Sequence, residues 1–134
     1  MPDVTIDLTD AVAVAATASL AGLAAASVFT VVPEGTAPPY IIIGDDTVDP
    51  TLGGKTGILE RHELRIATIF AGGSKRAMLA AQHQVRAALT TPPFAAPGAV
   101  LSIPVALTAS DHIDPQSGAL VGEQTFLIFA QPQS

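Results

Sequence analysis

The residues best suited to bind a cation form an acidic group at positions 45–49, with the sequence Asp-Asp-Thr-Val-Asp. This spacing matches a magnesium–diphosphate motif, in which a helix places the carboxylates on one face. Here Gly44 precedes the group and Pro50 follows it, and both residue types favour a loop over a helix. We therefore interpret the group as a solvated, negatively charged turn, with loose divalent-cation binding as the alternative.

A second acidic group, at residues 111–114 (Asp-His-Ile-Asp), could supply a metal site or an acid–base pair. The segment has the composition of a surface turn, and no second histidine lies near it in the sequence. The other histidines are expected elsewhere, His62 at the solvent end of a strand and His83 on a helix flank. The three histidines therefore do not predict a catalytic pair.

Two further patterns imitate nucleotide-binding or nucleophile motifs. Gly54-Lys55-Thr56 matches the end of a phosphate-binding loop, but position 49 holds Asp where the motif needs Gly, and a strand follows instead of a helix. Ser74 comes nearest to a nucleophile elbow, yet Arg76 stands where that motif needs its second Gly. We expect no catalytic residues, no cofactor site and no metal site.

The composition predicts one globular domain spanning residues 1–134. Hydrophobic residues make up 49% of the chain and charged residues 13%, which is too apolar for intrinsic disorder. The absence of cysteine excludes a disulfide framework and thiolate chemistry. Six basic and 12 acidic residues give a net charge of -6, which opposes close approach to a phosphate backbone. We therefore expect no tight nucleic-acid binding.

An uncharged run at residues 11–32 imitates an export signal. Three aspartates precede this run and the first basic residue is Lys55, whereas a secretory signal begins with a basic region. The run is mostly Ala with interspersed Thr, Ser and Gly, and is weaker than a Leu-rich membrane span. We expect a helix followed by a strand, and no membrane segment.

The first half of the chain predicts one helix and three strands. Helical spacing of apolar residues places the helix at about 5–18. A β-branched and aromatic segment predicts a short strand at 28–32, and the apolar run 40–43 predicts a buried strand closed by Gly44. Residues 59–71 alternate, and the inward face consists of His62, Leu64, Ile66, Thr68 and Phe70.

The second half predicts a helix and two more strands. Ser74 is the expected N-cap of a helix over about 75–89. The apolar stripe of this helix is Met78, Ala81, Val85 and Leu89, and its solvent side carries Lys75, Gln82 and Arg86. Strands at 99–108 and 120–130 follow, joined by a turn over 111–118. Inward positions of the first are Leu101, Ile103, Val105 and Leu107, and Pro104 is expected at an edge or a bulge.

These elements predict an α+β fold with a mainly antiparallel sheet of four to five strands and two helices packed on one face. The other face of the sheet is then free to meet partners. The connection at 45–57 is too long for an ordinary hairpin, and loops beyond about 12 residues are usually functional or disordered. We expect this long flexible loop to point outward to a partner.

Several short segments follow one another in a recognisable order. They are Val31-Val32-Pro33-Glu34-Gly35, Pro39-Tyr40-Ile41-Ile42-Ile43-Gly44, His62-x-Leu64-x-Ile66, Ala77 with Val85-Arg86-Ala87-Ala88-Leu89, Asp114-Pro115, and Phe126-Leu127-Ile128-Phe129-Ala130. Their order and spacing resemble the tail-completion or tail-terminator family of tailed bacteriophages and gene transfer agents. The resemblance covers nearly the whole chain. Gly122-Glu123-Gln124 stands where the family often has a basic residue or His, a departure that bears on partner contacts more than on the fold.

The resemblance implies a structural virion protein and not an enzyme. Such a subunit assembles into a ring, commonly a hexamer, at the head-proximal end of the tail tube. There it terminates tube polymerisation and joins the tail to the head connector. The implied partners are other copies of the chain, the tail tube protein and the head-closure or connector protein, while DNA passes through the ring without specific binding. The implied location is the tail neck of a virion assembled in the bacterial host cytoplasm.

The long loop is the expected partner-binding site within that assembly. Our hypothesis is that it orders against the tube or the connector when the ring docks. The residues expected to make the contacts are Asp45, Asp46, Val48, Asp49, Leu52 and Lys55.

Two alternatives accompany this interpretation. The first is a head-closure or stopper neck protein, which also forms a ring but contacts the portal side. The second belongs to another class: a small cytoplasmic enzyme or ligand-binding domain that uses Asp111, His112 and Asp114.

Overall fold

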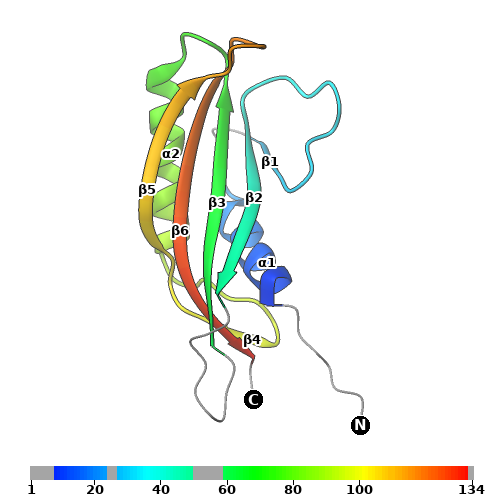
Figure 1. Ribbon diagram of the computed structural model, residues 1–134, viewed down its shortest axis with the longest axis vertical. Coiled ribbons are helices and arrows are strands. Elements are labelled where there is room, and N and C mark those ends of the chain that lie inside the picture. Colours follow the sequence, from blue (N-terminus) through cyan, green and yellow to red (C-terminus); the bar gives the residue numbers. More distant parts are fainter. Residues whose placement is uncertain (1–7, 24–26, 50–58, 133–134) are drawn as a thin grey trace.

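The computed structural model describes residues 8–23, 27–49 and 59–132, and in these residues it contains two helices and six strands (Figure 1). The elements in chain order are α1 (Leu8–Leu20), β1 (Ser27–Phe29), β2 (Tyr40–Asp49), β3 (Glu60–Phe70), α2 (Lys75–Thr90), β4 (Ala99–Leu101), β5 (Val105–Ile113) and β6 (Leu120–Pro132). The α+β class predicted from the sequence is confirmed.

The strands form one mixed sheet in the order β1-β2-β3-β6. The other edge of β6 pairs with β5 along 120–127 and with β4 along 130–132. All of these pairings are antiparallel except that of β1 with β2, which is parallel. The predicted count of four to five strands is too low, because Pro104 lies in the interruption at 102–104 that divides the expected strand 99–108 into two.

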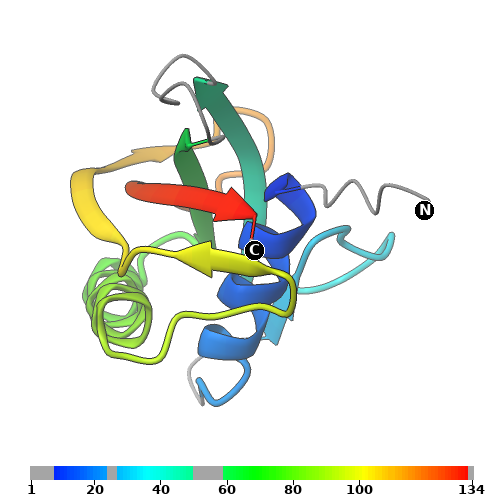
Figure 2. The ribbon, with the colours of Figure 1, turned by 90° about the horizontal axis from the view of Figure 1, so that it is seen from below.

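The core is built on the inward face of β3 and β6. His62, Leu64, Ile66, Thr68 and Phe70 are all buried, so the inward face predicted for β3 is confirmed. Leu64 lies opposite Phe126 and His62 opposite Ile128. The buried side chains of α1 join this hydrophobic cluster together with Val85 and Leu89 of α2, whereas Met78 and Ala81 of α2 form a second cluster with Phe70 and Leu120. In the end-on view the strands curve around α1 while α2 lies beside β5 (Figure 2).

Both helices follow their predicted positions closely. The predicted stripe of α2, formed by Met78, Ala81, Val85 and Leu89, is buried as expected. Ser74 precedes α2, but its side chain makes no capping hydrogen bond. Neither helix in the described part of the chain is long and apolar enough to cross a membrane.

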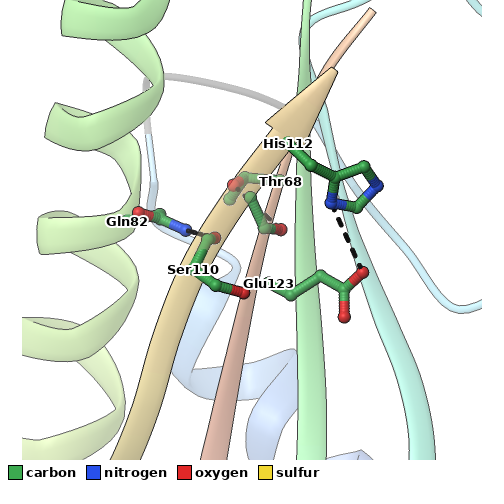
Figure 3. Close-up of polar contacts among 6 residues, drawn as sticks. Thr68, Gln82, Ser110, His112 and Glu123 are labelled. Atoms are coloured by element: carbon green, nitrogen blue, oxygen red, sulfur yellow. Dashed lines mark hydrogen bonds and ion pairs between the residues drawn. The ribbon is translucent and has the colours of Figure 1, made fainter. Parts of the chain in front are cut away.

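Gln82 departs from the prediction, which placed it on the solvent side of α2. It is 7% exposed, and its Nε2 donates to the backbone carbonyl of Ser110 on β5 at 3.2 Å (Figure 3). Gln124 Nε2 on β6 donates in turn to the backbone carbonyl of Gln82 at 3.0 Å. Helical periodicity could not reveal this role, because the position is buried by a polar contact to the sheet and not by an apolar one.

Gly122 on β6 provides the space for that contact. A Cβ added there would lie 2.5 Å from Thr68 Oγ1 and 2.8 Å from Met78 Sδ, and would also collide with the amide of Gln82. The glycine therefore permits α2 to approach the sheet closely enough for Gln82 to reach across β6 to β5.

Strand β2 extends further than predicted. Gly44 was expected to close it, yet β2 continues to Asp49, and its register against β3 shifts between Ile43 and Asp46. A Cβ at Gly44 would lie 3.2 Å from the Arg65 carbonyl, so the glycine permits close strand approach at a bulge instead of ending the strand. The interpretation of 45–49 as a turn is therefore wrong.

The close approach at Gly122 generates the first prediction. The substitution Gly122→Ala should lower the free energy of unfolding by about 1–3 kcal/mol, because the added methyl group overpacks the contact between α2 and the sheet. Urea denaturation followed by circular dichroism measures the change. Gly22→Ala is the matched control, since nothing lies within 4 Å of a Cβ at that position. An unfolding curve for Gly122→Ala that coincides with that of Gly22→Ala would contradict the prediction.

Candidate functional site

The candidate catalytic residues at 111–114 do not converge on one point. Asp111 and His112 lie in β5 and not in the predicted turn. Asp111 Oδ1 is 3.9 Å from Lys75 Nζ on α2, whereas His112 Nδ1 is 3.9 Å from Glu123 Oε1 on β6 (Figure 3). Because alternate residues of a strand point to opposite faces, Asp111 and His112 cannot act on one substrate atom.

Asp114 has a structural function in the turn that follows β5. Its Oδ1 accepts a hydrogen bond from the Gln116 backbone N–H at 3.0 Å, and its Oδ2 accepts one from Ser117 Oγ at 3.0 Å. The backbone N–H of Gln116 and the hydroxyl of Ser117 lower the pKa of this exposed carboxyl from its ordinary value of 3.8. Both carboxylate oxygens are therefore engaged in the turn.

The histidines likewise do not form a catalytic centre. His62 was expected at the solvent end of its strand, but it is fully buried on the inward face of β3, with Nε2 2.9 Å from Glu60 Oε1. His83 is exposed on α2. Burial of His62 follows from its place opposite Ile128 in the paired core strands.

Of the six predicted partner-binding residues, four lie in β2 and two lie outside the residues that the structure describes. Asp45, Asp46, Val48 and Asp49 lie in β2, where Asp46 pairs with Leu64 and Val48 with His62. Leu52 and Lys55 lie outside the described residues. Among the side chains that the structure describes, which do not include those of Asp45, Asp46 and Asp49, no three acidic or histidine groups are placed to hold a metal ion.

The surface most suited to a partner lies where β4 and β5 meet β6. Here five large apolar side chains are exposed, and we call them the β5 patch: Val100, Ile103, Val105, Leu107 and Phe129. Val100 and Phe129 line one hollow of about 230 Å³, and Val105 is 56% exposed. Several large apolar side chains exposed on neighbouring strands are typical of an interaction surface.

A β-bulge shapes the β5 patch. Ala106 pairs with Phe126 and Thr108 with Thr125, so Leu107 is the extra residue that has no partner on β6. Its side chain is 42% exposed. The bulge leaves Leu107 without a partner in the ladder, and Leu107 lies on the same exposed face as Val105, while Ala106 between them packs against the core.

The other half of β5 carries groups that protect a sheet edge. The Ser110 carbonyl is occupied by Gln82, and Asp111 and His112 each face a charged neighbour. Charges and covering side chains discourage the addition of another strand. The open part of β5 is therefore its beginning, Val105–Leu107.

A groove between α1 and α2 is the second apolar surface. It has a volume of about 670 Å³, and five of its ten described lining residues are alanine. The full lining is Ala15, Ala18, Ser19, Leu23, Gln84, Ala87, Ala88, Thr91, Pro93 and Ala95. We call it the helix groove, and none of these residues is charged.

The sequence prediction missed both surfaces. Ile103, Val105 and Leu107 were expected to point inward, but all three are exposed. The alternation that indicated a core face is equally satisfied by apolar residues on an uncovered strand. One signal was available: residues 87–110 contain no charged residue, and this stretch supplies half of the helix groove and most of the β5 patch.

Comparison with known proteins identifies a family and a similar fold. The family model described as tail completion protein gp17 matches residues 11–130. A chain in the structure titled "Virion of native gene transfer agent (GTA) particle" is 21% identical, with a TM-score of 0.81 over 95% of this chain and 99% of that one. No curated protein matches the sequence at a significant level.

The hydrogen bonds of Asp114 generate a pH prediction. Because the folded-state pKa is lowered, the carboxylate stabilises the fold above its unfolded pKa, and this contribution is lost as the pH falls through the folded pKa. Asp114→Ala should lower the melting temperature at neutral pH, and the difference from the parent should disappear in acid. Melting curves from pH 7 to pH 2 test this, with Gln116→Ala as a control that keeps the backbone N–H. A difference that does not depend on pH would contradict the assignment.

Proposed function

The chain belongs to the tail completion protein gp17 family, and from this membership we propose that it is a structural subunit of a virion. It assembles into a ring at the head-proximal end of the tail tube, terminates tube polymerisation and joins the tail to the head connector. The observation that carries the proposal is the family match over residues 11–130, which covers all the described helices and strands except the start of α1 and the end of β6.

The described surface supports a role based on protein contacts. The β5 patch and the helix groove are apolar and open, whereas the acidic and histidine side chains are dispersed or engaged in structural pairs. A subunit that closes a ring must present two different complementary surfaces, and these two meet that requirement. No catalytic role is part of the proposal.

The proposed partners are other copies of the chain in a hexameric ring, the tail tube protein and the head connector. The fold match to a chain of a gene transfer agent virion supports a location in the virion, at the tail neck, after assembly in the host cytoplasm. The net charge of -6 suits a ring that DNA traverses without specific binding.

We further propose that the segment around residues 45–55 contacts the tube or the connector. Val48 is partly exposed and is the last residue but one of β2. A deletion that tests the segment should spare Thr47–Asp49, because these residues pair with β3.

Particles assembled without this chain provide the direct test. We expect electron microscopy to show overlong tails without heads, because nothing ends tube growth or binds the connector. Supplying the chain in trans should restore tails of normal length that carry heads. Normal tails in its absence would contradict the proposal.

A second test separates tube termination from head closure. Mixed with purified tail tube protein, the chain should cap tubes and shorten them in proportion to its concentration. Gly22→Ala, at a position that belongs to neither apolar surface and where an added Cβ meets no atom within 4 Å, should act like the parent. Tubes that are neither capped nor shortened, together with binding to the portal side, would favour the head-closure alternative.

A further inference from the structure

We infer that adjacent copies of this chain join by seating the β5 patch of one subunit in the helix groove of the next. The inference rests on the proposed ring and names the two surfaces that would form its repeated contact. It commits to a second copy of the chain as the occupant of the helix groove.

The two surfaces differ in the size of their side chains. The groove is lined by small side chains such as Ala15, Ala87 and Ala88. The β5 patch exposes larger apolar side chains, among them Val105 and Leu107. A lining of alanines leaves room for larger apolar side chains to enter, as small residues do wherever two elements pack closely.

The two surfaces are also alike in having no charged residue. No described lining residue of the groove and no member of the β5 patch carries a charge, although the chain as a whole has a net charge of -6. Contact through these surfaces therefore leaves no ionised group of either surface without a partner.

The geometry of β5 favours side-chain docking over strand addition. The bulge at Leu107 interrupts the regular edge, and Gln82 occupies the Ser110 carbonyl further along the strand. A partner strand therefore cannot continue the ladder along β5. The exposed side chains of Ile103, Val105 and Leu107 remain available for a groove.

The contact is heterologous, because the two surfaces belong to different elements of one subunit. The β5 patch lies at the edge formed by β4 and β5, and the helix groove lies between α1 and α2. Each copy can then use both surfaces at once, which is the condition for a closed ring.

Pairs of single cysteines test the contact, because the chain contains no cysteine of its own. Chains carrying Leu107→Cys and Ala87→Cys are produced together in cells that make the particles. The purified particles are oxidised and analysed by non-reducing electrophoresis and peptide mass spectrometry. We expect a covalent dimer of this chain whose linked peptides contain positions 107 and 87, formed only when both variants are present.

The matched control replaces Ala87→Cys by His83→Cys, which is exposed one turn earlier on α2 but does not line the groove. This pair should give no dimer. Val105→Cys with Ala95→Cys repeats the test on the same two surfaces if the first pair does not enter particles. A dimer through two copies of position 107, a bond from position 107 to another protein, or no dimer from either pair would overturn the inference.

These outcomes differ from a failure of the proposed function. If the parent chain itself is missing from purified particles, the proposed virion role fails. If the parent chain is present and the cysteine pairs do not link, the role stands and the contact between the two surfaces is wrong.

Discussion

The antiparallel pairing of β3 with β6 is the constraint on which the rest of the structure depends. It continues in one register from the pair Glu60–Ala130 to the pair Phe70–Leu120. The inward positions from His62 to Phe70 and from Leu120 to Ala130 are all buried, so a slip by one residue would expose the apolar set of that strand to solvent. Buried residues of both helices share a hydrophobic cluster with this face, and the remaining strands pair along its edges. The positions of the other surfaces therefore depend on this pairing.

The parts of the fold that depend on burial against one face were predictable from the sequence. Leu64, Ile66 and Phe70 stand at alternate positions of one strand, and the stripe from Met78 to Leu89 has helical spacing. Both patterns fit burial against one face, because a side chain that faces the core must be apolar or have a partner. The structure accordingly places both sets in the core.

The parts that were mispredicted depend on contacts that leave no periodic signal. Gly44 permits a close strand approach at a bulge, yet in sequence it has the same appearance as a glycine that ends a strand. Gln82 is buried because Gly122, distant in the chain, leaves room for its amide. Ile103, Val105 and Leu107 alternate like core residues but lie on an uncovered edge. Only the sheet order distinguishes these cases, and that order is set by contacts between distant residues.

Three of the residues for which local rules failed, Ile103, Val105 and Leu107, also belong to the β5 patch. An exposed apolar edge is a hazard to a free subunit, because it can recruit further strands without limit. Here the bulge at Leu107 and the capping of Ser110 by Gln82 remove strand addition from the available modes of contact. The remaining mode of contact is the docking of a small set of side chains, and this docking has a fixed direction. Repeated contact between two unlike surfaces gives a closed ring when the rotation between copies closes and an open fibre when it does not. The polar link from α2 to β5 therefore does more than stabilise the fold, since in the proposed assembly it limits how one copy can meet the next.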